Sequence, residues 1–303
     1  MERFGICIQR PLVCLALIMF LMVDPYVIVA QPPGTASSKL DQEIRSCIQV
    51  VDAYINLSED MTLAQCRGAA FAQAKRQALE SAQTYIKTKT KVEDFTVAYD
   101  LIWSETEGNV RILEQNDFGV ENNSRYHVWI KAEVTYDIKQ KTANTNENLL
   151  MGKGAPLTVK VWSDKKKYLA GENITIYIQG NRDFFARIVD IAPSGDIVQL
   201  LPNDYRKLNL FEAGKIYKIP DGEDKFMLNV SPPYGEDRIV VYASESPLGE
   251  IDTQSIGQGL RSYKGNEKDL AAKSRGIEVN PAYPNAFNGT EFFEGNWSLF
   301  TED

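Results

Sequence analysis

Histidine and cysteine are scarce in this chain, and their scarcity excludes several enzyme classes. His127 is the one histidine among 303 residues, and four residues are cysteines. A nucleophile-and-base hydrolase needs a base beside its Ser or Cys, and a zinc hydrolase needs several His or Cys ligands. No G-x-S-x-G turn and no G-x-x-x-x-G-K phosphate loop occurs. We therefore predict that the protein is not an enzyme and has no catalytic residue, cofactor or resident metal.

Basic clusters and long apolar runs are also lacking beyond the N-terminus. The formal net charge is −8, and the nearest approach to a basic run is the Lys triplet at 165–167, which fits a solvated turn. Nucleic acid and anionic lipid both demand phosphate-neutralising Lys and Arg. We expect the protein to bind neither. No stretch after residue 30 is apolar enough to span a bilayer.

The first 30 residues have the features of a secretory signal peptide. Arg3 and Arg10 precede an apolar run at residues 12–23, which Asp24 ends, and a small-residue site stands at Ala30. We predict cleavage after Ala30 and a periplasmic or otherwise exported protein. The alternative is an uncleaved anchor, but a spanning helix needs about 20 apolar residues. Membrane contact would then be indirect, or made through an uncleaved signal.

Two of the four cysteines, Cys47 and Cys66, remain after the predicted cleavage. An even pair in an exported protein suggests one disulfide. Cys47 begins a strand-like run and Cys66 lies in the first turns of the helix that follows it. Closing this loop would stabilise the fold by about 3 kcal/mol on the chain-entropy model. Two separate buried thiols are the alternative.

Residues 43–138 predict an α+β domain with one long helix on an antiparallel sheet. Apolar residues alternate at 51–57 and 126–136, which is typical of half-buried strands, and 95–113 adds one or two more. Between them, residues 62–87 carry an Ala-rich apolar stripe at helical spacing. A strand, a long helix and further strands indicate one helix packed against a sheet.

The segments before and after this domain differ from it in composition and in predicted secondary structure. Residues 31–42 read as a flexible leader and the polar stretch 139–156 as an interdomain linker. Residues 157–251 predict a mainly-β, sandwich-like domain, and 252–303 a mixed C-terminal extension with a short helix and packed aromatics. Seven short apolar runs carry the sandwich prediction: 157–162, 174–179, 184–191, 197–201, 215–219, 225–230 and 238–243.

A specific order of residues runs through this β-rich segment. The pattern comprises Tyr168, Ala170-Gly171-Glu172, Ile174-Thr175-Ile176, Asn181-Arg182-Asp183-Phe184-Phe185, Asp190, Gly195, Leu200-Leu201-Pro202-Asn203, Ala213-Gly214, Ile219-Pro220 and Ser274-Arg275-Gly276-Ile277. It resembles the bacterial domain of unknown function 4384 over residues 157–277. The resemblance implies an exported accessory module without established catalytic residues.

The N-terminal domain carries a weaker resemblance. Its Ala-rich helix after the strand at 51–57, followed by a closing strand at 128–134, is similar to the N-terminal domain of flagellar assembly protein T and related outer-membrane lipoproteins. The resemblance implies work by protein contact at the periplasmic face of the outer membrane. No lipidated Cys stands at the predicted mature start, so direct anchoring does not follow.

Residues around two turns of the β-rich domain are the candidate binding surface. Asp183, Phe184, Asn203 and Tyr205 lie near strand ends, and aromatic residues are enriched at interface cores. We expect most aromatics of this region to be core and Tyr205 to be exposed. His127 stands on the polar face of its predicted strand, which predicts a surface or interface histidine.

Aspartates 183, 190, 196 and 204 cluster in the sequence around the same strand ends. They lack the dense alternating spacing of a Ca²⁺ loop. We expect Asp183 and Asp196 to be turn residues and Asp190 and Asp204 to be solvated. A paired-carboxylate hydrolase stays open, because it needs only two acidic side chains about 5–9.5 Å apart in a cleft.

Together these features predict a non-catalytic exported accessory protein of the bacterial cell envelope. It would act through protein-protein contacts with another envelope protein or envelope component. The alternatives are a carboxylate-based cell-wall glycan hydrolase and a sensory module that binds a small ligand in the β-domain, for which an apolar cavity is the expected sign.

Overall fold

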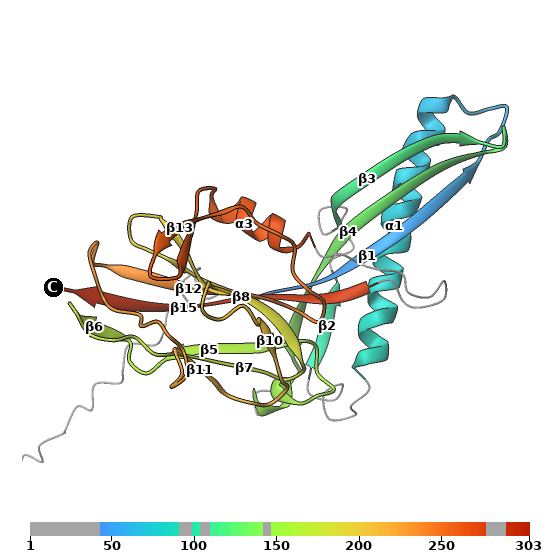
Figure 1. Ribbon diagram of the computed structural model, residues 1–303. Helices are drawn as coiled ribbons and strands as arrows, with labels where there is room; N and C mark the ends of the chain where they lie inside the picture. Colours follow the sequence, from blue (N-terminus) through green and yellow to red (C-terminus); the bar gives the residue numbers. More distant parts are fainter. Residues whose placement is uncertain (1–42, 91–98, 104–109, 142–146, 277–288) are drawn as a thin grey trace, which may run out of the picture. The chain divides into compact units, whose positions relative to one another are not determined.

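A computed structural model of the chain describes residues 43–90, 99–103, 110–141, 147–276 and 289–303. The N-terminal region contains strands and one long helix: β1 Ile44–Asn56, α1 Leu63–Lys89, β2 Tyr99–Trp103, β3 Val110–Glu121 and β4 Arg125–Gln140. Strand β4 pairs antiparallel with β1, β2 and β3, and α1 packs on β1 and β4 (Figure 1). This confirms the predicted helix on an antiparallel sheet. No helix of the described part is long and apolar enough to cross a membrane.

Helix α1 begins at a capping box and buries a stripe of small residues. The Thr62 hydroxyl accepts from the Gln65 backbone N–H, while the Gln65 side chain accepts from the Thr62 backbone. Its fully buried residues include Ala70, Ala74, Ala78 and Ala82. These recur every four residues, so they form one face, and their small side chains let the helix backbone lie close to the sheet.

The predicted disulfide is wrong, because the two cysteines lie toward opposite ends of α1. Both are buried free thiols of one hydrophobic cluster. Cys66 lies in the first turn of α1, whereas the Cys47 thiol interacts with Tyr85 and Lys89 in its last turns. From Cys66 to Tyr85 the helix rises about 28 Å at 1.5 Å per residue, but a disulfide needs Cα atoms within about 7 Å. Burial raises the pKa of the Cys47 thiol, whose sulfur accepts a hydrogen bond from Gln49 at 3.0 Å.

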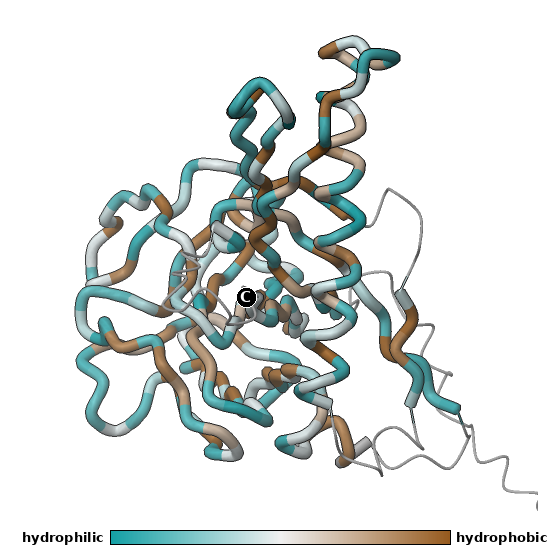
Figure 2. Tube along the Cα trace, turned by 90° about the vertical axis from the view of Figure 1, so that its right-hand side faces the viewer, coloured by the Kyte–Doolittle hydropathy of each residue, from teal (hydrophilic) through white to brown (hydrophobic). Residues whose placement is uncertain are grey.

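The β-rich region forms a sandwich-like structure with two short helices. Its elements are η2 Glu147–Met151, β5 Val159–Ser163, β6 Lys167–Leu169, β7 Ile176–Gly180, β8 Phe184–Ile191, β9 Ile197–Leu201, β10 Leu210–Phe211, β11 Tyr217–Ile219, β12 Glu236–Ser244, β13 Thr253–Gly257, β14 Leu260–Tyr263, α3 Glu267–Ser274 and β15 Gly289–Glu302. A small sheet, β11-β7-β5, shares a hydrophobic core with part of a larger one. Hydrophobic and hydrophilic residues are interspersed along the trace of the chain (Figure 2).

The larger sheet runs through both predicted domains. Its order is β13-β14-β9-β8-β12-β15-β1-β4-β2, so the C-terminal strand β15 lies between β12 and β1 (Figure 1). Residues Lys39–Asp303 form one compact unit. The stretch 139–156 therefore does not separate two compact units. The predicted extension 252–303 supplies a central strand of this sheet, because β15 pairs with β12 along one edge and with β1 along the other.

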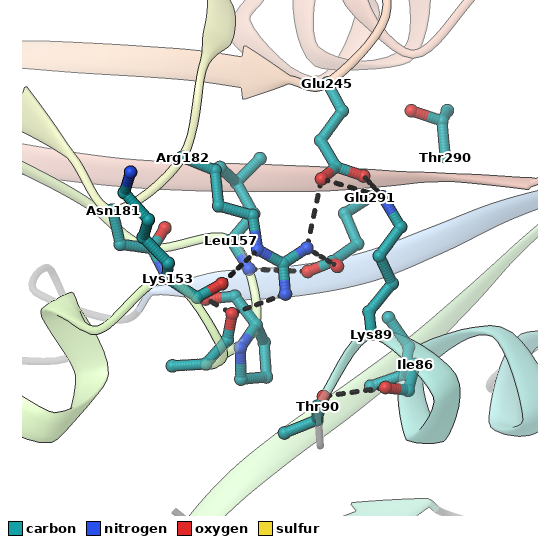
Figure 3. Close-up of polar contacts among 12 residues, drawn as sticks. Ile86, Lys89, Thr90, Lys153, Leu157, Asn181, Arg182, Glu245, Thr290 and Glu291 are labelled. Carbon is teal, nitrogen blue, oxygen red and sulfur yellow. Dashed lines mark hydrogen bonds and ion pairs between the residues drawn. The ribbon is translucent and has the colours of Figure 1, made fainter. Parts of the chain in front are cut away.

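A buried ionic cluster fastens the end of α1 to the β-rich region (Figure 3). Arg182 Nη1 lies 2.5 Å from Glu291 Oε1 and 3.0 Å from Glu245 Oε1, and Glu245 also pairs with Lys89 at 3.3 Å. Glu291 Oε2 accepts the Leu157 backbone N–H at 2.5 Å. Burial raises the pKa of Glu291 against the opposing effect of Arg182, whereas Arg182 and Lys89 outweigh burial and lower the pKa of Glu245. These charges are compensated in place, so we assign the cluster a structural role.

Candidate functional site

A pocket of about 660 Å³ opens between the two sheets of the sandwich-like region. We call it the sandwich pocket. Strands β7, β8, β9, β12 and β15 line it, together with the β13–β14 hairpin and residues 227–233. Residues 225–230, predicted as a strand, instead form an irregular segment with one bridge, Asn173 to Asn229, and part of it lines the pocket. Its volume is within the range of about 300–1,000 Å³ that small-molecule sites occupy.

Strand alternation places two carboxylates in this pocket. On β8, the residues Phe184, Ala186 and Ile188 are fully buried in the core, and Asp190 continues the same face. On β12, Asp237 shares the face of Ile239 in the same way. Asp190 pairs with Ile239 in the ladder, which makes Asp237 its diagonal neighbour. Such neighbours are about 7–8 Å apart.

The two carboxylates differ in their partners. Asp190 Oδ1 is shielded from solvent and has no hydrogen-bond partner within the described part of the chain. Burial, with a contribution from the charge of Asp237, raises the pKa of Asp190 to about 7. Asp237 Oδ2 lies 2.9 Å from the Thr301 hydroxyl, which opposes the rise that burial causes in the pKa of Asp237. A buried polar atom without a partner is uncommon, and it points to a function.

The rest of the lining is apolar or uncharged apart from one further acid. Asp196 lies at the pocket rim, where its Oδ2 is 2.7 Å from the Ser194 hydroxyl. No Lys, Arg or His is among the lining residues of the described chain. Ile174, Leu200 and Leu228 contribute to the apolar walls. Among the described residues no group of three His, Cys, Asp or Glu side chains is placed to hold a metal ion. The arrangement can hold an apolar group and can meet a positive charge or a hydrogen-bond donor with its carboxylates.

The four residues predicted as a binding surface do not form one. Phe184 is fully buried and stacks on Phe211 in the core. Asn203 is buried as well, where its Oδ1 accepts from the backbone of the turn that follows it. Asp183 Oδ1 accepts the Ala213 backbone N–H at 2.7 Å, which links the start of β8 to the segment after β10. Tyr205 is 50% exposed, as expected, whereas Phe184 and Asn203 are buried, so these residues do not share an exposed surface.

The sequence predicted Asp190 as solvated, and the structure corrects this. The signal was its place on a strand: it follows Phe184, Ala186 and Ile188 at the same spacing of two, so it continues an apolar face. Asp237 and Thr301 were missed altogether. Nothing in the local sequence joins them to Asp190, because the pairing of β8 with β12 and of β12 with β15 brings them together.

His127 is buried rather than exposed, although it lies on the sheet face opposite α1. Its ring lies between Tyr54 and Phe118, with centroids 4.2 and 4.5 Å away. Nε2 is 2.9 Å from Asp52 Oδ1 and Nδ1 is 2.6 Å from Glu121 Oε1. Two carboxylate partners require both ring nitrogens to donate, which is the protonated form. Burial opposes that charge, but the hydrogen bonds to Asp52 and Glu121 outweigh it and raise the pKa of His127.

Comparison with known proteins identifies part of the β-rich region. No curated protein and no solved structure matches the chain. These comparisons therefore do not support the resemblance of the N-terminal domain to flagellar assembly protein T. Residues 167–247, which contain both Asp190 and Asp237, match the family model of a domain of unknown function, DUF4384.

Proposed function

We propose that the protein is a non-catalytic, exported accessory protein of the bacterial cell envelope, and that it binds another envelope component in the sandwich pocket. The observation that carries this proposal is the pocket itself, with the unpartnered oxygen of Asp190 at its apolar wall. An N-terminal segment typical of a signal peptide supports export to the periplasm. The match to DUF4384 is compatible with it but assigns no activity.

The energetics of Asp190 favour a binding role over a structural one. A buried acceptor without a partner costs about 1–3 kcal/mol, and more when it is charged. Nothing within the described chain offsets this free-energy cost, since no basic side chain lines the pocket around Asp190 and its Oδ1 has no hydrogen-bond partner. A ligand that donates to Asp190 would recover the cost on binding. Functional sites often contain such destabilising groups.

The N-terminal region offers a second contact surface on the sheet face opposite α1. Tyr54 and Phe118 are exposed there on either side of the His127 ring. Exposed aromatic residues are common at protein interfaces. The resemblance to the N-terminal domain of flagellar assembly protein T favours the same role, contact with an envelope protein.

Capture from a native envelope fraction tests the proposal. Ala192 lines the pocket and is partly exposed, so Ala192→Phe should fill the pocket with little effect on the core. The matched control is Ala72→Phe on the exposed side of α1. We expect the wild-type protein and the control to retain the same envelope component and the Ala192→Phe variant to lose it. Capture of nothing, or equal capture by all three proteins, would contradict the proposal.

The pair Asp190 and Asp237 supports a second candidate, a glycan hydrolase. Two carboxylates about 7–8 Å apart in one cleft fall within the range that inverting glycosidases use. The raised pKa of Asp190, about 7, suits a general acid. This candidate predicts release of soluble fragments from purified peptidoglycan, and loss of that release in Asp190→Asn and Asp237→Asn. Peptidoglycan that stays intact under the wild-type protein eliminates it.

A further inference from the structure

We infer that the ligand of the sandwich pocket carries a primary ammonium group on an apolar stem, as a lysine side chain of a partner protein or an alkylamine does. This inference rests on the proposed binding function and specifies its ligand. Charge, the treatment of buried acids elsewhere in the chain, and the shape of the pocket each support it.

The pocket carries uncompensated negative charge. Its titratable lining residues are Asp190 on β8, Asp196 in the β8–β9 turn and Asp237 on β12, and none is basic. Within the described part of the chain, no ion pair joins any of the three to a Lys, Arg or His. A low-dielectric wall strengthens the attraction of such a site for a cation.

Elsewhere this protein pairs its buried carboxylates with cations. Among the ion-paired carboxylates of the described residues, five have side chains no more than 16% exposed, and each has at least one Arg or Lys within 3.3 Å: Glu133, Asp224, Glu245, Glu291 and Glu294. Asp190 departs from this pattern, because it has an oxygen shielded from solvent and no cation beside it. The missing partner is therefore a cation, and the pocket opening lets a ligand supply it.

The apolar walls specify what carries the charge. Ile174, Leu200, Leu228 and Leu260 contribute to them, and they suit an aliphatic stem. A bare divalent cation fits poorly, since Ca²⁺ takes six to eight oxygen ligands and these walls supply few. An ammonium group has three donors, which suits Asp190 Oδ1 and the neighbouring carboxylate of Asp237. Lysine itself has this design, a charged head on an apolar stem.

The test is titration of the full-length protein with hexylammonium, followed by NMR. The neutral probe 1-hexanol has the same stem and serves as the matched ligand. We expect hexylammonium to bind at least about tenfold tighter than hexanol, because a hydrogen bond to a charged group is worth about that factor. Asp190→Asn and Asp237→Asn should each weaken hexylammonium binding and leave hexanol binding unchanged. The control Glu236→Gln, an exposed acid beside Asp237, should change neither.

A second pair of probes separates the two sources of ammonium. A capped lysine peptide should bind, and its ε-acetylated form should not, if a partner protein supplies the group. Binding of hexylammonium without the lysine peptide assigns the pocket to free alkylamines.

The outcomes also separate this inference from the proposed function. Equal binding of hexylammonium and hexanol, no effect of the Asp190 and Asp237 substitutions, or no binding of either probe overturns the ammonium assignment. In each case, capture of an envelope component that Ala192→Phe abolishes would leave the pocket as a binding site for another ligand. Failure of that capture as well would overturn both.

Discussion

Replacing Asp190 by asparagine should stabilise the protein at neutral and alkaline pH. Burial raises the pKa of Asp190 from its ordinary value of 3.8 to about 7, and the charge of Asp237 adds to the rise. Desolvation and a like charge both penalise the ionised carboxylate. The asparagine amide has nearly the same shape and no charge to desolvate. The substitution should therefore remove the penalty while it keeps the packing.

The pH dependence follows from the protons that each state binds. Between pH 3.8 and about 7 the folded chain keeps a proton on Asp190 that the unfolded chain has lost. The free energy of unfolding therefore falls as the pH rises through this window. At about 1.4 kcal/mol per pH unit, the full penalty above pH 7 is about 4 kcal/mol. At pH 5 only about 2 kcal/mol of it applies.

Urea unfolding at pH 5 and pH 8, followed by tryptophan fluorescence, measures this difference. Asp190→Asn should exceed the wild type by about 4 kcal/mol at pH 8 and by about 2 kcal/mol at pH 5. The exposed control Glu236→Gln should stay within about 0.5 kcal/mol of the wild type at both pH values. An Asp190→Asn protein that is less stable than the wild type at pH 8, or whose advantage does not depend on pH, would show that no desolvated charge resides in the pocket.

Three further substitutions test other parts of the fold. His127→Gln should lower the Tm by a few degrees at pH 6. The difference in Tm should shrink as the pH rises through the raised pKa of His127, because the wild-type ring then loses the charge that stabilises the fold. A difference that does not depend on pH would contradict this. Ala78→Leu should cost about 1–3 kcal/mol by overpacking the face between α1 and the sheet, while Ala72→Leu on the exposed face should be nearly neutral in the same urea titration. Arg182→Met should cost about 3–5 kcal/mol because it leaves the buried carboxylate of Glu291 without its cationic partner, and adding Glu291→Gln should restore part of the loss; a double variant no more stable than Arg182→Met would refute the pairing argument.

Local periodicity predicted most of the secondary structure. The short apolar runs predicted as strands at 184–191 and 197–201 correspond to β8 and β9 residue for residue, and the Ala stripe corresponds to α1. Such patterns are visible because each residue's face depends only on its own position in a helix or strand. The short strands β6 and β10 were not predicted, since two or three residues are too few to show a period.

Features that depend on distant pairing could not be read from the sequence. Cys47 and Cys66 are close along the chain, yet Cys47 lies near the start of β1 and Cys66 lies in the first turn of the helix that follows the far end of this strand. The two domains looked separate because polar residues follow β4. Strand β15, at the C-terminal end of the described chain, pairs with both β1 and β12, and no local sequence pattern predicts the register of this pairing.

The same long-range pairing explains why the pocket cannot belong to the DUF4384 segment alone. Residues 167–247 supply both carboxylates, but Leu299 and Thr301 come from β15, and Gln258 and Leu260 from the β13–β14 hairpin. Strand β15 also pairs with β1, the strand on which α1 packs. Strand β15 is therefore shared by the wall of the pocket and the N-terminal sheet, so the pocket is complete only when the C-terminal strand has paired with both β12 and β1.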